Sequence, residues 1–269
     1  MNISVCIDAV LREMEPDQAI RALGSIGIGA YEFWSWEDKD LGAMAAAMGE
    51  TGLQAAAMCT SAFNLTDPAF RETYVAELRR SVRAAGRIQC TTLITQVGSD
   101  TGAERARQRQ SIVDGLRACI SVLEEEGVTL VIEPLNTAID HRGYYLTASA
   151  EAFSIVREVG SPRVKVLYDI YHQQIMEGNI LNTVLNNLDC IAHMHAAGLP
   201  GRHELYFGEL YYPAIFAALE QYGYAGYVGL EYTPIENALS GIIRSIKKED
   251  VEWGKVFHAQ KSEGFPSQE

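Results

Sequence analysis

Short apolar runs recur along the chain, and four of them in its second half end on a residue able to bind a metal. These runs are rich in Val, Ile and Leu and span residues 128–133, 164–169, 190–195 and 226–231. Such composition and length are typical of strands buried on both faces of a parallel sheet. The intervening segments are long enough for a helix and two loops, so the pattern predicts successive parallel strands.

Four further runs in the first half fit the same pattern, at residues 3–8, 30–34, 53–59 and 91–97. Helical segments are predicted between the strands. They cover Pro16 to about Gly24, residues 41–50, the stretches containing Phe70–Val82 and Ile112–Leu123, and residues 147–159, 213–222 and 237–257. Eight alternating units favour a (β/α)8 TIM barrel. A doubly wound dinucleotide fold is disfavoured because no Gly-x-Gly-x-x-Gly turn follows the first strand.

One predicted helix has an unfavourable charge order. Arg105, Arg107 and Arg109 lie near its start and Glu124 to Glu126 near its end. This order opposes the helix dipole. We therefore expect the ends either to fray or to find partners elsewhere.

Composition agrees with one globular domain, predicted at residues 1–257 and followed by a polar tail at 258–269. The 269 residues are 48% hydrophobic, without an apolar run of about 18 residues or a signal peptide, which indicates a soluble, cytoplasmic protein. The five scattered cysteines suggest neither a disulfide framework nor a thiolate zinc site. The net charge of −13, with no basic cluster, excludes nucleic acid as an expected partner, and no membrane is expected either.

The strand ends carry the candidate metal site. In a closed barrel, Glu133, Asp169, His195 and Glu231 would meet at the carboxyl-terminal mouth, where barrel enzymes place their chemistry. Three carboxylates and an imidazole suit one divalent ion, Mn²⁺ first, with Mg²⁺ and Co²⁺ as alternatives. Each acidic residue could instead cap the next helix or form a salt bridge, but four in register favour a shared ligand set.

Two polar residues are candidates for substrate binding. His172 lies beyond a strand end, where it could hold a substrate hydroxyl or could be a surface residue at a helix start. Arg202 lies in the longest loop of this half, residues 196–211, which lacks a predicted element and is typical of a functional lid or a disordered segment. Its guanidinium could grip a carboxylate or phosphate, or it could be solvated.

Three further residues border the predicted mouth or lie below it. Trp34 could wall the pocket against a sugar, or pack in the core or at a subunit interface. Gln96 is a weaker polar candidate at the end of the fourth strand. His193 alternates with His195 and is interpreted as a satisfied core residue.

Several motifs resemble the hydroxypyruvate isomerase-like group of the xylose isomerase-like TIM barrels. The most specific is Asp-Ile-Tyr-His-Gln-Gln-Ile-Met-Glu-Gly at residues 169–178; Glu-Pro-Leu-Asn at 133–136, Pro-Gly-Arg-His-Glu at 200–204 and Gly-Leu-Glu-Tyr at 229–232 agree with it. The likeness extends to Phe-Trp-Ser-Trp at 33–36 and Thr-Gln-Val-Gly at 95–98, so it covers nearly the whole chain.

The resemblance implies a single divalent metal held by Glu133, Asp169, His195 and Glu231, with the two glutamates also moving protons. The expected reaction is isomerisation of a small ketose or keto-acid through a metal-stabilised enediolate. A ketose 3-epimerase is the alternative, because members best known as hydroxypyruvate isomerases tend to carry glutamine at the position of His195, whereas the 3-epimerases use histidine there. A non-catalytic sugar-binding barrel is the alternative of another class. The family habit also suggests a homodimer or homotetramer.

Overall fold

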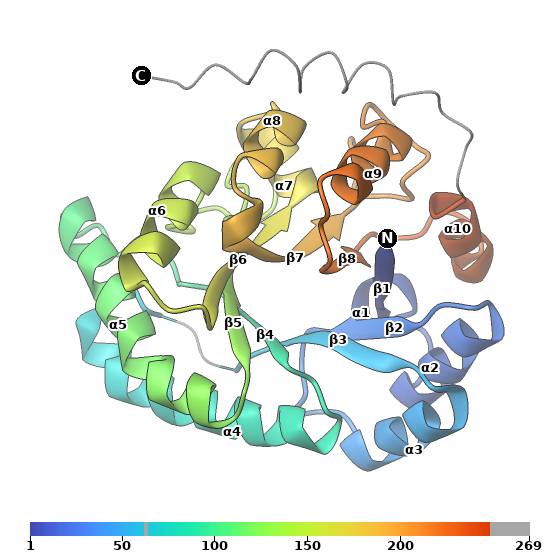
Figure 1. Cartoon of the computed structure of the whole chain (residues 1–269), viewed down its shortest axis with the longest axis horizontal. Helices are drawn as coiled ribbons and strands as arrows, with labels where there is room; N and C mark the ends of the chain where they lie inside the picture. The colour runs from blue at the N-terminus through green and yellow to red at the C-terminus, as the bar shows by residue number, and fades with distance from the viewer. Residues whose placement is uncertain (62–63, 248–269) are drawn as a thin grey trace.

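The computed structural model describes residues 1–61 and 64–247, and within them eight parallel strands form a closed barrel (Figure 1). Each strand pairs with the next, and β8 pairs with β1 to close the ring. The strands are β1 (Asn2–Cys6), β2 (Ala30–Phe33), β3 (Gln54–Cys59), β4 (Thr92–Thr95), β5 (Thr129–Ile132), β6 (Val164–Asp169), β7 (Ile191–Ala196) and β8 (Tyr227–Leu230). The predicted barrel is confirmed.

Helices surround the barrel and connect its strands (Figure 1). They are α1 (Ile7–Val10), α2 (Pro16–Ser25), α3 (Leu41–Thr51), α4 (Arg71–Arg87), α5 (Arg105–Glu125), α6 (Ser149–Val159), α7 (Ile170–Met176), α8 (Ile180–Leu185), α9 (Tyr212–Gln221) and α10 (Ala238–Ser245), with the 3₁₀ turns η1 (Pro68–Phe70) and η2 (Leu188–Cys190). In the described part of the chain, no helix is both long and apolar enough to cross a bilayer.

The core has two parts. The larger part packs the outward faces of the strands against the helices. Inside the barrel lies a small apolar cluster of Ala57, Ile94, Val131 and Leu167, contributed by β3 to β6. The interior positions of β1, β2 and β7 carry the buried polar residues Ser4, Glu32 and His193 instead. One half of the barrel interior is therefore apolar and the other half is polar.

Local signals set several element boundaries. Pro16 begins α2, and the Asp67 carboxylate caps η1 by accepting a hydrogen bond from the Ala69 amide at 2.9 Å. The expected first strand was too long, because the chain turns into α1 at Ile7. The predicted closing helix at 237–257 is described only as α10, and residues 248–257 and the predicted tail lie outside the described residues.

Two of the three arginines near the start of α5 have acidic partners on α6. Arg105 pairs with Glu151, and Arg109 pairs with Glu158 at 2.5 Å. The expectation that these arginines find partners elsewhere is confirmed. Opposite charges on the neighbouring helix satisfy them where the dipole of their own helix does not.

Candidate metal centre and cavity

Four side chains from adjacent strands converge at the carboxyl-terminal end of the barrel. Glu133 follows β5, Asp169 ends β6, His195 lies in β7 and Glu231 follows β8. One ligand atom from each lies within 4.8 Å of the others, and all four residues are buried. The structure brings together the set that the sequence proposes as metal ligands.

The orientation of His195 fits a cation in this cluster. Its Nδ1 atom is buried, lies 3.5 Å from Glu133 Oε1 and 3.3 Å from Glu231 Oε2, and has no well-formed hydrogen bond. A buried nitrogen that faces several carboxylate oxygens without a hydrogen-bond partner is the environment that a bound ion satisfies. Nitrogen and carboxylate donors suit Mn²⁺, Mg²⁺ or Co²⁺.

The two glutamates differ in electrostatic environment. Burial, together with the nearby charges of Glu231 and Asp169, raises the pKa of Glu133 to about 7. Burial alone would also raise the pKa of Glu231, but the charges of His195 and Arg202 outweigh it and hold that pKa well below its usual value. In the metal-free chain the two carboxyl groups are therefore unequal, Glu231 being the more readily ionised.

Asp169 serves two purposes at once. Its Oδ1 accepts hydrogen bonds from the amides of Tyr171 at 2.7 Å and His172 at 3.1 Å, which caps α7. Its Oδ2 faces the site, 3.4 Å from His172 Nε2 and 3.8 Å from an Arg202 nitrogen. The capping alternative is confirmed for this residue, and it leaves one oxygen available for a metal.

Arg202 reaches from the loop after β7 into the site. Its guanidinium pairs with Glu231 and lies 5.3 Å from the centre of the Tyr171 ring. The alternative of a solvated arginine was wrong, because the side chain is only 23% exposed. The neighbouring His203 instead points away, its Nδ1 lying 2.8 Å from the Thr233 carbonyl.

His172 is fully buried, so the alternative of a surface histidine was wrong. The Asn136 amide oxygen accepts hydrogen bonds from the amides of Ile139 and Asp140, which leaves its amide nitrogen to donate to His172 Nδ1 at 2.6 Å. Because Nδ1 accepts, the proton of the neutral ring lies on Nε2. Burial lowers the pKa of His172, which favours this neutral donor form.

A cavity of about 390 Å³ opens above the four side chains. Glu133, His195 and Glu231 line it, together with the predicted substrate-binding residues His172, Arg202, Trp34 and Gln96. Trp34 is 46% exposed and its indole nitrogen donates to Glu231 Oε1 at 2.5 Å. Trp34 therefore borders the cavity and is not a core residue.

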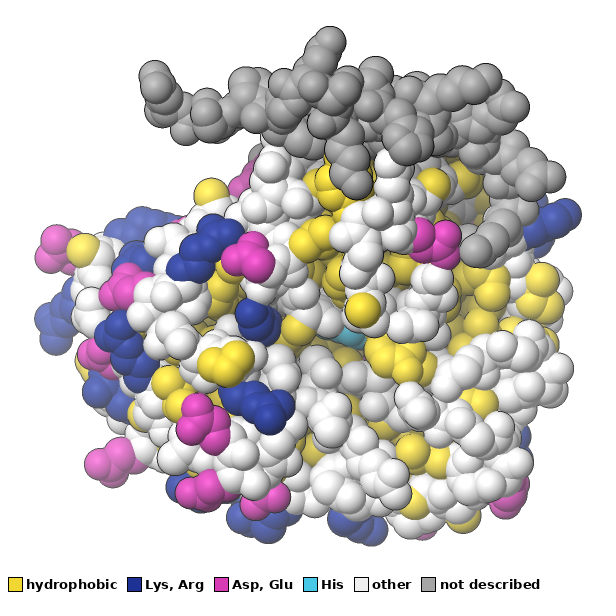
Figure 2. Space-filling model, viewed as in Figure 1, with side chains coloured by type: hydrophobic (Ala, Val, Ile, Leu, Met, Phe, Trp, Pro, Cys, Tyr) yellow, Lys and Arg dark blue, Asp and Glu magenta, His cyan; other side chains and the backbone are white. Residues whose placement is uncertain are grey.

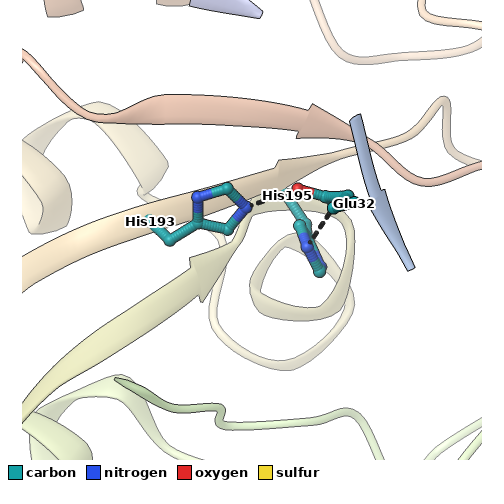
Figure 3. Close-up of side chains that lie close together, drawn as sticks. All are labelled: Glu32, His193 and His195. Carbon is teal, nitrogen blue, oxygen red and sulfur yellow. Dashed lines mark hydrogen bonds and ion pairs between the residues drawn. The ribbon is translucent and has the colours of Figure 1, made fainter. Parts of the chain in front are cut away.

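Two residues near the site were not predicted from the sequence. His141 lines the cavity from the loop after β5, and no periodicity distinguishes it from other loop residues. Glu32 lies on β2 and contacts His193 and His195 (Figure 3). The sequence does contain a signal for Glu32: it is a carboxylate in the middle of a buried strand, and such a group needs a partner inside the barrel.

Sequence relatives agree with the geometry. The sequence model of the xylose isomerase-like TIM barrel family matches residues 18–249. A putative hydroxypyruvate isomerase from Homo sapiens is 32% identical over 83% of this chain and 86% of that protein. A 2-oxo-tetronate isomerase from Cupriavidus necator is 38% identical, but the match covers only 52% of this chain and 54% of the relative, so the chain spans about half of that relative's length.

Solved structures show the same architecture. A structure described as an AP endonuclease of family 2 from Brucella melitensis has a TM-score of 0.87 and 26% identity, covering 92% of this chain and all of that one. A D-psicose 3-epimerase from Clostridium cellulolyticum H10 has a TM-score of 0.75 at 19% identity, covering 92% of this chain and 91% of that one, which shows a shared fold. With its closed barrel and the match over residues 18–249, this chain belongs to the xylose isomerase-like TIM barrel family.

Proposed function

We propose that this chain is a divalent-metal-dependent isomerase that moves a proton between neighbouring carbons of a small ketose or keto-acid. The observation that carries the proposal is the convergence of Glu133, Asp169, His195 and Glu231 within 4.8 Å of one another, beside an open cavity that all but Asp169 line. A bound divalent cation would supply Lewis-acid chemistry, acidifying a hydrogen next to a carbonyl and stabilising the charge that develops on oxygen.

The two glutamates are the proposed proton carriers. They approach the cavity from β5 and β8, and Glu231 is the more readily ionised of the two in the metal-free chain. Paired carboxyl groups with separated pKa values suit an acid and a base. A bound cation would lower both pKa values. One glutamate would remove the proton and the other would return it, and either order fits the site.

Two donors above the floor are proposed to bind substrate oxygens. His172 offers the Nε2 proton that its bond to Asn136 fixes, and Arg202 offers a charged fork suited to carboxylates and hydroxyls. Trp34 would form an apolar wall beside them. These three side chains would orient the substrate and exclude water, and none of them would take part in the proton transfer.

A 3-epimerase is the alternative on the same site. Return of the proton by the glutamate on the far side of the same carbon gives epimerisation, whereas return at the adjacent carbon gives isomerisation. Relatives named as isomerases reach 32–38% identity, while the epimerase structures share about a fifth of their residues or fewer, which favours isomerisation.

An activity on nucleic acid has weaker support. The chain carries a net charge of −13, and Figure 2 shows basic and acidic side chains intermixed on the left and lower parts of the face. Proteins that bind phosphate backbones need a positive surface instead.

The test is turnover in deuterated water. Chain loaded with Mn²⁺ and incubated with three- to six-carbon ketoses and keto-acids should place deuterium on carbon, read by NMR, and product structure should separate isomerisation from epimerisation. Excess chelator should abolish exchange and Mn²⁺ should restore it. Glu133→Gln and Glu231→Gln should each reduce the rate by about 10²-fold or more, the typical contribution of a general acid or base.

Two results would contradict the proposal. Full exchange in the presence of chelator would exclude the metal, and binding without any exchange across the whole panel would favour a non-catalytic sugar-binding barrel. If the product strictly retained the substrate hydrogen, the reaction would proceed by a hydride shift and not by proton transfer through the two glutamates.

A further inference from the structure

A second polar cluster shares His195 and extends deeper into the barrel. It consists of Glu32 on β2 with His193 and His195 on β7 (Figure 3). Glu32 and His193 are each 1% exposed. A carboxylate at this depth is costly unless charged and hydrogen-bonded partners satisfy it, so its contacts indicate what holds it there.

The two oxygens of Glu32 have different partners. Oε2 accepts a hydrogen bond from the Ser4 hydroxyl at 2.9 Å and lies 2.7 Å from His193 Nε2. Oε1 lies 2.9 Å from His195 Nε2, although the ring N–H is not aligned well enough to form a hydrogen bond. Ser4 and His193 therefore anchor one oxygen, and the other oxygen is directed at His195.

Gly229 leaves space for this carboxylate. It lies on β8, paired with His195 on one side and with Ser4 on the other. A Cβ atom at Gly229 would lie 2.2 Å from Glu32 Oε1. The backbone conformation at Gly229 does not require glycine, since its φ is not positive. The absence of a side chain at this position is therefore explained by the space that the Glu32 carboxylate occupies.

We propose that Glu32 is a positioning residue whose Oε1, 2.9 Å from His195 Nε2, attracts the Nε2 proton electrostatically and so turns Nδ1 toward Glu133 and Glu231. A histidine ligand binds metal through one nitrogen only if the proton of the other nitrogen is held elsewhere, and a carboxylate is a common holder. The part of this inference that concerns metal rests on the proposed function. The contact between Glu32 and His195 does not.

A separate metal ion among Glu32, His193 and His195 is the competing explanation, because these atoms also lie close enough for shared ligation. The contacts favour positioning. Oε2 is already engaged by Ser4 and His193, and His195 Nδ1 faces the other cluster. The positioning role requires one ion per chain, and two ions would overturn it.

The first test is NMR of the metal-free chain. The wild-type protein should show a His195 Nε2 proton protected from exchange, assigned by its loss in His195→Gln. Glu32→Leu, which has a similar size but no acceptor, should lose that protection. Tyr74→Phe is the matched control. It removes a buried 2.8 Å hydrogen bond between Tyr74 and Thr95, which does not involve His195, so this variant should keep the signal. A protected signal in Glu32→Leu would overturn the inference.

The second test is Mn²⁺ affinity measured by competition with a chelating dye. Glu32→Leu should bind about 10- to 100-fold more weakly, the usual effect of losing an outer partner of a ligating histidine. Glu32→Gln, which keeps a weaker acceptor and protects against a failure to fold, should fall between Glu32→Leu and wild type. Unchanged affinity in both variants would contradict the role. A wild-type chain that binds no divalent ion would refute the proposed function, while the NMR result would still decide whether Glu32 holds His195.

Discussion

At the scale of single residues, Asn136 controls the chemistry of His172. The Asn136 oxygen is committed to two backbone amides in the loop after β5, and its nitrogen donates to Asp140 at 2.7 Å as well as to His172 Nδ1. The ring is thereby fixed as a neutral donor that points toward Asp169 and the cavity. An exchange of amide for carboxylate would reverse this arrangement without changing the shape of the side chain.

Asn136→Asp should therefore raise the pKa of His172. In the wild-type chain burial lowers this pKa below the usual value of 6.5, so the ring is neutral at pH 7. A carboxylate at position 136 would stabilise the imidazolium, so the ring would lose its proton only at higher pH. An NMR titration of the His172 ring proton measures the shift. Asn186→Asp, the same change on the exposed surface beside α8, should leave the titration unchanged, and an unshifted titration in Asn136→Asp would contradict the assignment.

At the scale of elements, the loop between β7 and α9 is an ordered unit. The sequence predicts either a lid or a disordered segment here. The structure contradicts the disordered segment, because the Gly198 amide donates to the His203 carbonyl at 2.7 Å and the Glu209 amide to the Leu199 carbonyl at 2.8 Å. The buried carboxylate of Glu204 accepts hydrogen bonds from two amides in the loop after β8. These contacts hold Arg202 over Glu231.

Gly208→Ala should disturb this unit. Gly208 has a φ of +96°, and a Cβ atom would lie 2.0 Å from the Leu199 carbonyl oxygen. The backbone must shift, which displaces Arg202, and a displacement of about 1 Å in a binding group can reduce kcat/KM on the order of 100-fold.

Gly127→Ala is the control, because Gly127 also has positive φ, at +68°, but open space around its Cβ position. It should lower the free energy of unfolding by about 1 kcal/mol and leave kcat/KM near wild type. Equal kcat/KM in the two variants, measured by steady-state kinetics, would show that the loop geometry does not matter.

At the scale of the whole molecule, the barrel and its four converging side chains were predictable because they depend on short-range patterns. Each of Glu133, Asp169, His195 and Glu231 ends an apolar run, and closure of a parallel barrel places strand ends together. The bounds of α1 and α10 were less predictable, since weak local signals decide where a chain leaves a strand or helix.

The remaining site features depend on distances across the barrel. Glu32 contacts a residue 161 positions away, and Arg202 contacts Glu231 because two loops pack together. No periodicity in one segment reports such contacts. A buried charge within a strand is the clearest available signal, and it identifies Glu32 but not its partner.

The most direct test of the central claim is a crystal of the chain soaked in Mn²⁺ and measured at the manganese absorption edge. We expect one anomalous peak per chain, bonded to Glu133, Asp169, Glu231 and the Nδ1 atom of His195. A peak between Glu32 and His193 would contradict this expectation. So would the absence of a peak at the carboxyl-terminal end of the barrel after a soak at high Mn²⁺ concentration.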